Sequence, residues 1–415
     1  MSTVAIETAP AAPPPAPPRL RSRTARPLLL MSLVLLVFAL VRVLTGANEL
    51  TSDGTLSAAV TSAIPLGLAG LAGLWSERAG VVNVGLEGMM ILGTWGAGWA
   101  GSQYGVWAGV AVGIAMGAMG GLLHAVVTIT FGVDQIVSGV AINLLGYGVC
   151  QFLSKLAYPD QPTQSPQIPE MQTFTVPWLP DALDKIVAHH WFLVSDLASV
   201  LHALVTNVPY LTVIAIALLP ITYVILWRTA FGLRLRSCGE APYAAETLGV
   251  NVYRYKYIAV VMSGALAGFG GAFLAIFSGI YREGQTGGKG FIGLAAMIFG
   301  NWRPGGLAAG AGLFGYTDAL QARSDEGVHA LLLVFAIGVG AYGGWLLWRR
   351  HFVGGTIGLV AAAGLVLWYL RAETLPQQLV YVTPYVTTLL VLSLASQRLR
   401  MPAADGLIYR KGQGK

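Results

Sequence analysis

The charged and amide side chains that interrupt the apolar sequence are the residues that could do chemistry. The stretch "WSERAGVVNVGLEGMMILG", residues 75–93, places Glu77, Arg78, Asn83 and Glu87 between two apolar runs. A charge at the centre of a bilayer costs about 2.5–3.5 kcal/mol on insertion scales, so such groups pair, face water or mark a polar path. Two interpretations stay open. The stretch is either a broken helix beside a path for a solute, or a tight turn at the membrane surface in which Arg78 pairs with Glu77 or Glu87.

Two further stretches hold polar or aromatic groups in apolar surroundings. In "GVDQIVSGVAINLLGYG", Asn143 lies inside a helix that Asp134 would cap, and it either faces a path or hydrogen-bonds between helices. In "GGKGFIGLAAMIFGNWRPGG", residues 287–306, glycine-rich turns flank a short apolar helix that contains Phe291. Phe291 either stacks on an aromatic solute or simply packs against its neighbours. The candidates for a translocation pathway are therefore Asn83, Glu87, Asn143 and Phe291.

Patterns for enzymatic chemistry are missing from the sequence. It contains no HExxH motif and no constellation typical of a Ser-His-Asp triad or a carboxylate pair. Gly-Gly-Lys-Gly at residues 287–290 lacks the spacing and the Ser/Thr of a phosphate-binding P-loop. Two cysteines, Cys150 and Cys238, are too few for a disulfide or metal framework. We therefore expect no catalytic residue, no metal site and no cofactor bound by this chain.

The composition is that of a membrane protein. Of the 415 residues, 11% are charged and 55% are hydrophobic, with a mean hydropathy of +0.65. A soluble domain has about 25% charged residues. The net charge of +6 fits the Arg and Lys that gather in cytoplasmic loops, so no nucleic-acid partner is predicted.

Apolar runs divide the chain into twelve candidate helices. They lie at residues 28–44, 57–75, 84–101, 106–131, 135–153, 209–227, 257–281, 290–301, 305–322, 328–348, 354–371 and 378–396. The segment 290–301 is well under the ~20 residues that span a bilayer. We expect a broken or re-entrant helix there, which is tolerated only where protein or a water-filled cavity covers its ends.

Basic residues orient these helices. Arginines before the first apolar run place the N-terminus in the cytoplasm, within a disordered tail of residues 1–27. Alternation then puts the mainly acidic loop 154–208 outside and the Arg-rich loop 228–256 inside. Residues 28–397 form the transmembrane domain, and residues 398–415 form a second cytoplasmic tail with further basic residues.

The inner loop contains one compact stretch, "RSCGEAPYAAETLGVNVYRYK", residues 236–256. Pro242 suits the first helical position, Glu240 suits the N-terminal flank, and Gly249 suits the position after the end. A helix of roughly two turns is below the ~12–15 residues at which an isolated helix is even marginal in water, so it needs a surface to lie on. It is either an element that transmits a push from a soluble partner or an ordinary structured loop.

Five segments, in order, resemble a known family. They are similar to the permease subunits of bacterial ABC importers in the branched-chain amino acid, ribose and nucleoside group, and most similar to the nucleoside or simple-sugar branch. The resemblance is carried by "SERAGVVNVGLEGMM", "GVDQIVSGVAINLL", "RSCGEAPYAAETLGVNVYRYKYIAVVMSGALAGFGGAFL", "GKGFIGLAAMIFGNWRPGGLAAGAGLFGYTDALQ" and "TPYVTTLLVLSLASQRLRMPAADGLIYRKGQG". Together these segments span most of residues 57–323 and 376–414.

The resemblance implies a transport subunit without an ATP site of its own. In this family the inner loop docks into a separate ATPase subunit as a coupling helix. The family pattern falls here on Gly239, Glu240, Pro242, Ala244, Ala245 and Gly249. The ATPase would hold ATP and Mg, a second homologous permease, usually a different chain, would complete the pore, and an extracytoplasmic lipoprotein would deliver the solute. The implied activity is import of nucleosides across the bacterial plasma (inner) membrane by alternating access.

One region departs from the family pattern. Residues 324–375 add length for a two-helix hairpin, whose role the resemblance does not assign. Two added spans leave the C-terminus in the cytoplasm. The predicted fold is therefore an all-α polytopic membrane protein with about ten family-type transmembrane segments plus this hairpin, some of its helices short or re-entrant.

Three other functions are alternatives to nucleoside import. The same machine could carry a simple sugar such as ribose, although the form "SERAGVVNVGLEG" favours nucleosides. An ion-coupled secondary transporter would show buried acidic residues in mid-helix and inverted repeats, whereas acidic residues here lie mostly near helix ends. An integral membrane enzyme would need a cluster of catalytic residues at one membrane face, which the sequence does not contain.

Overall fold

The structure is a computed structural model that describes residues 25–189, 191, 194–372, 375–395 and 399–412. In this part of the chain the regular structure is helical apart from one short two-stranded ribbon. Each of the twelve predicted apolar runs falls on a helix, and the predicted all-α architecture is confirmed. Most of the predicted tail 1–27 lies outside the described residues, and the first helix begins at Ala25.

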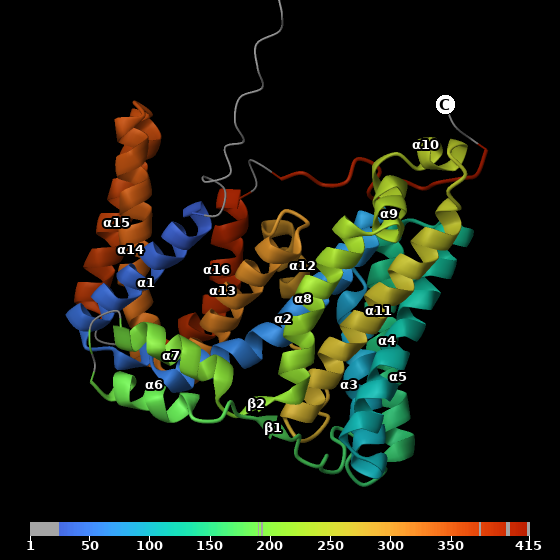
Figure 1. Cartoon of the computed structure of the whole chain (residues 1–415), viewed down its shortest axis with the longest axis horizontal. Helices are drawn as coiled ribbons and strands as arrows, with labels where there is room; N and C mark the ends of the chain where they lie inside the picture. The colour runs from blue at the N-terminus through green and yellow to red at the C-terminus, as the bar shows by residue number, and fades with distance from the viewer. Residues whose placement is uncertain (1–24, 190, 192–193, 373–374, 396–398, 413–415) are drawn as a thin grey trace, which may run out of the picture.

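The elements follow one another along the described chain in the order shown in Figure 1. They are α1 (Ala25–Thr45), η1 (Asn48–Leu50), α2 (Asp53–Arg78), α3 (Leu86–Tyr104), α4 (Val106–Ala125), the π-helical turn η2 (Val126–Thr130), α5 (Gln135–Ala157), β1 (Thr173–Phe174), α6 (Leu179–Ala188), α7 (Val194–Val205), β2 (Val208–Pro209), α8 (Tyr210–Arg228), α9 (Ala230–Glu240), α10 (Pro242–Thr247), α11 (Val252–Phe277), α12 (Lys289–Phe299), α13 (Pro304–Arg323), α14 (Asp325–Trp348), α15 (Phe352–Arg371) and α16 (Gln377–Ala395).

Seven stretches of the described chain are long and apolar enough to cross a membrane. They contain α2, α4, α5, α8, α11, α14 and α15. The predicted spans α3 and α13 are rich in glycine, which lowers their hydropathy, and both bury much of their length against neighbouring helices. The chain is therefore a multi-pass helical bundle.

The bundle has two ends that differ in structure. At one end, the top of Figure 1, lie α9, α10 and the last described residues; we call it the α10 end. At the other end lie α6, α7 and the β1–β2 ribbon, and we call it the ribbon end. The helices α2 and α11 are the most buried of the candidate spans, so they form the centre of the bundle.

Glycines allow α4 and α11 to pack at backbone contact. A Cβ atom on Gly117 would lie 2.4 Å from the carbonyl oxygen of Gly264, and one on Gly268 would lie 2.4 Å from that of Gly113. Contacts this short exclude any side chain, so the two glycine ladders fix how closely these helices approach.

The region 154–208 forms a cap over the ribbon end. It contains α6 and α7, which pack against each other, and its strand β1 pairs antiparallel with β2. His202 of α7 lies 2.7 Å from a carboxylate oxygen of Asp53, the first residue of α2, which ties the cap to the bundle. The hairpin α14–α15 lies beside α1 at the left edge of Figure 1, across the molecule from α4 and α5.

Candidate functional site

A buried carboxylate joins the start of α3 to the start of α12. Glu87 is 7% exposed, and its two carboxylate oxygens accept hydrogen bonds from the backbone N–H groups of Gly288 (2.9 Å) and Gly290 (2.7 Å). The first N–H groups of a helix have no partner within the helix, and the helix dipole favours a negative charge there. Glu87 therefore caps α12 from another helix, and a Cβ on Gly290 would lie only 2.7 Å from it.

The two candidate asparagines hold the turn between α2 and α3. Asn143 accepts a hydrogen bond from the N–H of Gly88 (2.7 Å) and donates to the carbonyl of Val84 (3.1 Å). Asn83 is fully buried and donates to the hydroxyl of Ser263 in α11 (2.9 Å). Because these amides bond to the chain itself, their geometry favours the helix-bonding alternative over a solute-facing one.

The helix α12 is a half-length helix, as its sequence predicted. It has 11 residues, and a non-helical segment of residues 278–288 leads into it from α11. This segment runs from the ribbon end of α11 to Glu87 in the first turn of α3. Phe291, in the first turn of α12, is 46% exposed. Within a membrane, irregular backbone is tolerated where it is buried in protein or lines a cavity, and transporters use it to meet polar solutes.

A second carboxylate lies in the irregular segment, and sequence reasoning missed it. Glu283 accepts hydrogen bonds on one oxygen from the hydroxyl of Tyr147 (2.7 Å) and the amide of Gln151 (2.6 Å), both in α5. The hydrogen bond from Tyr147 lowers the pKa of Glu283, so the carboxylate stays charged near neutral pH. The only sequence signal was a charged pair within the glycine-rich run "YREGQTGG".

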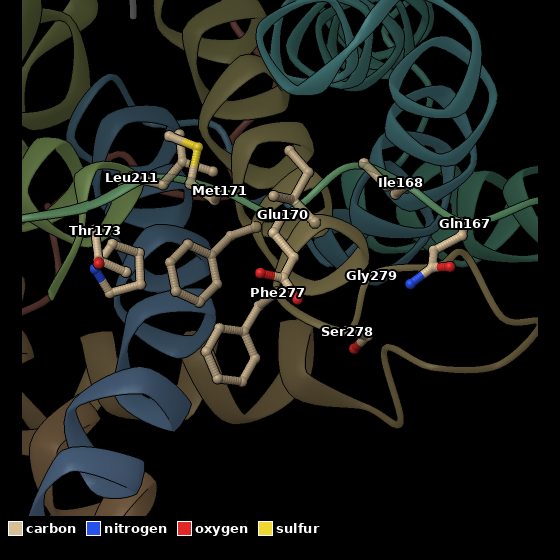
Figure 2. Close-up of a pocket in the computed structure, with 12 residues that line it drawn as sticks. Gln167, Ile168, Glu170, Met171, Thr173, Leu211, Phe277, Ser278 and Gly279 are labelled. Atoms are coloured by element: carbon tan, nitrogen blue, oxygen red, sulfur yellow. The ribbon is translucent and has the colours of Figure 1, made fainter. Parts of the chain in front are cut away.

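Two cavities open near this segment. One, of about 420 Å³, is lined by Tyr147, Thr163, Gln164, Arg282, Glu283 and Gly284. The other, of about 350 Å³, is shown in Figure 2. Its lining includes Glu170 and the parallel rings of Phe273 and Phe277, whose centroids lie 6.0 Å apart. Both volumes are within the range of small-molecule sites, about 300–1,000 Å³.

At the α10 end, the predicted short helix is present and is preceded by another, α9. Within α10, Pro242 and Ala245 are buried against the bundle, whereas Tyr243 and Ala244 are exposed. Leu248, just after the helix, is 84% exposed. Gly249 ends the helix with a φ of +81°, a conformation that favours glycine. A small apolar face on a short helix is thus presented to the outside of the molecule.

The helix α9 lies directly on the turn that follows α2. A Cβ on Gly239 would lie 2.4 Å from the carbonyl oxygen of Arg78, so only glycine fits there. The carboxylate of Glu240 lies 3.8 Å from the Arg78 guanidinium, which also donates to the carbonyl of Trp302 (2.6 Å). The predicted pairing of Arg78 with Glu77 or Glu87 is therefore wrong, because both glutamates point to other partners.

The described residues contain no group of three or more His, Cys, Asp or Glu side chains that could hold a metal ion. His124 is buried and bonds to Ser138 (2.9 Å) and to the carbonyl of Val82 (3.0 Å).

The candidate site has two parts. One is the polar region around the broken helix α12, and the other is the exposed short helix α10. The buried turn between α2 and α3 connects them.

Comparison with known proteins places this arrangement in a family. Residues 55–324, which extend from α2 through α13, match the family described as branched-chain amino acid transport system / permease component. The chain belongs to this permease family. The protein is thus a multi-pass membrane subunit for transport, and permeases of ABC transporters generally work with an ATPase and a substrate-binding protein.

Curated relatives cover most of this permease. The guanosine ABC transporter permease protein NupQ of Bacillus subtilis is 34% identical over 364 residues, 86% of this chain and 96% of that protein. The nucleoside ABC transporter permease protein NupC of Lactococcus lactis is 33% identical over 358 residues, 84% of this chain and 94% of that protein. TsgC13 of Haloferax volcanii, whose name refers to a glucose ABC transporter, is 34% identical over 275 residues, 66% of this chain and 78% of that protein. No solved structure matches the chain.

Proposed function

We propose that this permease is the transmembrane subunit of an ATP-driven importer that moves nucleosides across the bacterial plasma membrane by alternating access. The observation that carries the proposal is the similarity, over 84–86% of the chain, to two permeases named for guanosine and nucleosides. In this proposal the α10 end is cytoplasmic and the ribbon end is outside, with both termini in the cytoplasm. The basic residues of the 228–256 loop support this orientation.

The proposed assembly has three kinds of partner. An ATPase subunit, which binds the ATP and Mg, would receive the exposed face of α10 formed by Tyr243, Ala244 and Leu248. A second homologous permease, expected to be a different chain, would complete the pore. A substrate-binding lipoprotein would deliver the solute to the ribbon end. This chain itself would carry no catalytic residue and no cofactor.

The solute path is proposed to run along the segment that precedes α12. Its polar lining includes Glu283, a charged acceptor that suits the hydroxyl donors of a ribose. Aromatic faces are available at Phe291 and Phe277, which are 46% and 58% exposed and could stack on a base. Glu87, Asn83 and Asn143 would act beside this path by fixing the turn and the start of α12.

Replacing Glu283 tests this path. We expect Glu283→Gln to raise the KM for nucleoside uptake by roughly tenfold, because a hydrogen bond to a charged acceptor contributes about 1.5–3 kcal/mol. The maximal rate should change much less. The matched control is Asp160→Asn, which should leave KM unchanged. Asp160 is an exposed acidic residue in the loop that follows α5. Unchanged KM for Glu283→Gln would remove this residue from the path.

Uptake of labelled solutes tests the cargo. Uridine, adenosine, guanosine and ribose would be supplied to cells with and without the gene. Loss of one or more nucleosides, with ribose uptake unchanged, is the expected result. Import of a sugar such as ribose is the second candidate, because TsgC13 is named for glucose. Loss of ribose uptake alone would establish that alternative in place of nucleoside import.

A further inference from the structure

The C-terminal segment of residues 399–410 packs against the α10 end of the bundle and is hydrogen-bonded to it. Its backbone donates hydrogen bonds from Ala404 to the carbonyl of Gly239 (2.8 Å) and from Ala403 to the carboxylate of Glu240 (3.2 Å). Arg400 donates from its backbone to the side chain of Asn301, between α12 and α13 (2.8 Å). Figure 1 shows this segment crossing the top of the bundle toward α10. It is thus bonded both to α9 and to the turn before α13.

Tyr409 anchors the segment on the short helix. Its side chain is 7% exposed, and its ring lies 5.3 Å from the ring of Tyr243 in α10 and 5.4 Å from that of Tyr253 in α11. It shares one apolar cluster with Ala245 of α10 and Cys238 of α9. The six residues of α10 are too few to be stable alone, so the helix depends on packing such as this contact with Tyr409.

Asp405 is buried beside the end of α2. Its side chain is 7% exposed and its carboxyl lies beside that of Glu77, which accepts a hydrogen bond from the indole of Trp302 (2.5 Å). Burial raises the pKa of Asp405 to about 7. Two buried carboxylates repel each other, whereas a pair that holds one proton attracts. The position of Asp405 next to Glu77 is therefore favourable while the pair holds one proton and unfavourable when both carboxyls are ionised.

We propose that residues 399–410 form a strut that carries the movement of α10 to the turn between α2 and α3, with Tyr409 and Asp405 as its positioning residues. This inference rests on the proposed docking of α10 on the ATPase. Without the strut, a push on α10 could be absorbed where its ends bend, at Ala241 and Gly249. With it, α10 is linked through Tyr409 and Asp405 to Glu77.

Contacts continue from Glu77 to the start of α12, beside the proposed solute path. The turn that begins two residues later leads into α3, whose second residue, Glu87, accepts hydrogen bonds from the N–H groups of Gly288 and Gly290 at the start of α12. A displacement of the strut would therefore reach the start of the broken helix through direct contacts. The strut lies outside residues 55–324, which match the family model, and within the last of the five segments that resemble the family.

The test uses the assembled transporter in proteoliposomes with its ATPase and binding protein. Tyr409→Ala should reduce uptake by roughly tenfold, a typical coupling effect, while ATP hydrolysis stays within about twofold of the unmodified protein. Tyr409→Phe keeps the ring and should restore uptake. Normal uptake by Tyr409→Ala, or an equal loss of uptake and hydrolysis, would overturn the strut.

Asp405→Asn provides a second test of the strut in case Tyr409→Ala does not fold. The groups that face Asp405 are Glu77 and Arg78 of α2, Glu240 of α9 and Lys256 of α11. Because the pKa of Asp405 is raised, the seated segment is favoured at low pH and loses stability as pH rises through about 7. Uptake per ATP should fall between pH 6 and 8 in the unmodified protein and stay level in Asp405→Asn, roughly one pH unit either side of that value. An identical pH profile would overturn the strut.

Leu248→Asp separates this proposal from the docking of α10. Leu248 is exposed and is not part of the strut. If Leu248→Asp loses the ATPase while Tyr409→Ala transports normally, docking stands and the strut fails. If Leu248→Asp keeps both the ATPase and normal uptake, the docking role of α10 fails and the strut fails with it.

Discussion

Glu240→Lys is expected to abolish transport while the protein remains folded in the membrane. Glu240 ends α9, where its carboxylate lies 3.8 Å from Arg78 and accepts a hydrogen bond from the backbone of Ala403. The Glu240 side chain is 53% exposed, although that of Arg78 is only 12% exposed. Ion pairs with such an exposed partner contribute about 0–1 kcal/mol, so the loss of stability should be small. A lysine there would repel Arg78 and displace α10 from the position that the ATPase would engage.

Uptake into cells and the amount of protein in membranes would be measured together. We expect uptake to fall by at least roughly tenfold, within the range of coupling effects, with the membrane level maintained. Glu326→Lys is the matched control, since it reverses an exposed charge in the first turn of α14, away from α10. Normal uptake by Glu240→Lys would sink the assignment of this loop to coupling.

Glu87→Ala is expected to cost both stability and transport. The substitution removes the acceptor of two backbone N–H groups, those of Gly288 and Gly290, at a site that is only 7% exposed. Leaving a buried donor without a partner costs about 1–3 kcal/mol for each group. The start of α12 should therefore fray, and the irregular segment before it should lose its fixed end.

Thermal unfolding of the purified protein and uptake would be compared for two variants. Glu87→Gln keeps an acceptor oxygen but removes the charge that favours a helix N-terminus, an effect of about 0.3–1 kcal/mol. The order of stability and of uptake should be unmodified protein, then Glu87→Gln, then Glu87→Ala. Equal stability of all three would contradict the capping role. Glu326→Ala, at an exposed position, should behave as the unmodified protein.

Local signals in the sequence explain what could be predicted. The run at 290–301 was too short to span, and the structure has an 11-residue helix there. The Pro242 and Gly249 signals bound a short helix, and both residues lie at its ends in the structure. Such features depend on the backbone chemistry of a few neighbouring residues, which the sequence states directly.

Partners distant in sequence explain what could not be predicted. The sequence predicted that Arg78 pairs with a nearby glutamate, but α9 and the turn between α12 and α13 pack against the end of α2 and bring Glu240 and the carbonyl of Trp302 to it instead. Glu283 gained its importance only from Tyr147 and Gln151, more than a hundred residues earlier. The helix α9 and the seating of residues 399–410 likewise arise from packing, which no local pattern reports.

Cross-linking from α10 tests the central claim most directly. Leu248→Cys and Val353→Cys would each be labelled with a photoactivatable thiol reagent in the assembled transporter. Leu248 follows α10, and Val353 is in the first turn of α15, a helix that begins at the α10 end of the bundle in Figure 1. The two residues are similarly exposed, at 84% and 77%. The native Cys150 and Cys238 are buried, and burial raises the pKa of Cys238 to about 11, so neither should react.

We expect position 248 to be cross-linked to the ATPase subunit and position 353, in the first turn of α15, not to be cross-linked to it. Cross-links from position 353 alone, or none from position 248 in a complex that hydrolyses ATP and transports, would contradict this expectation.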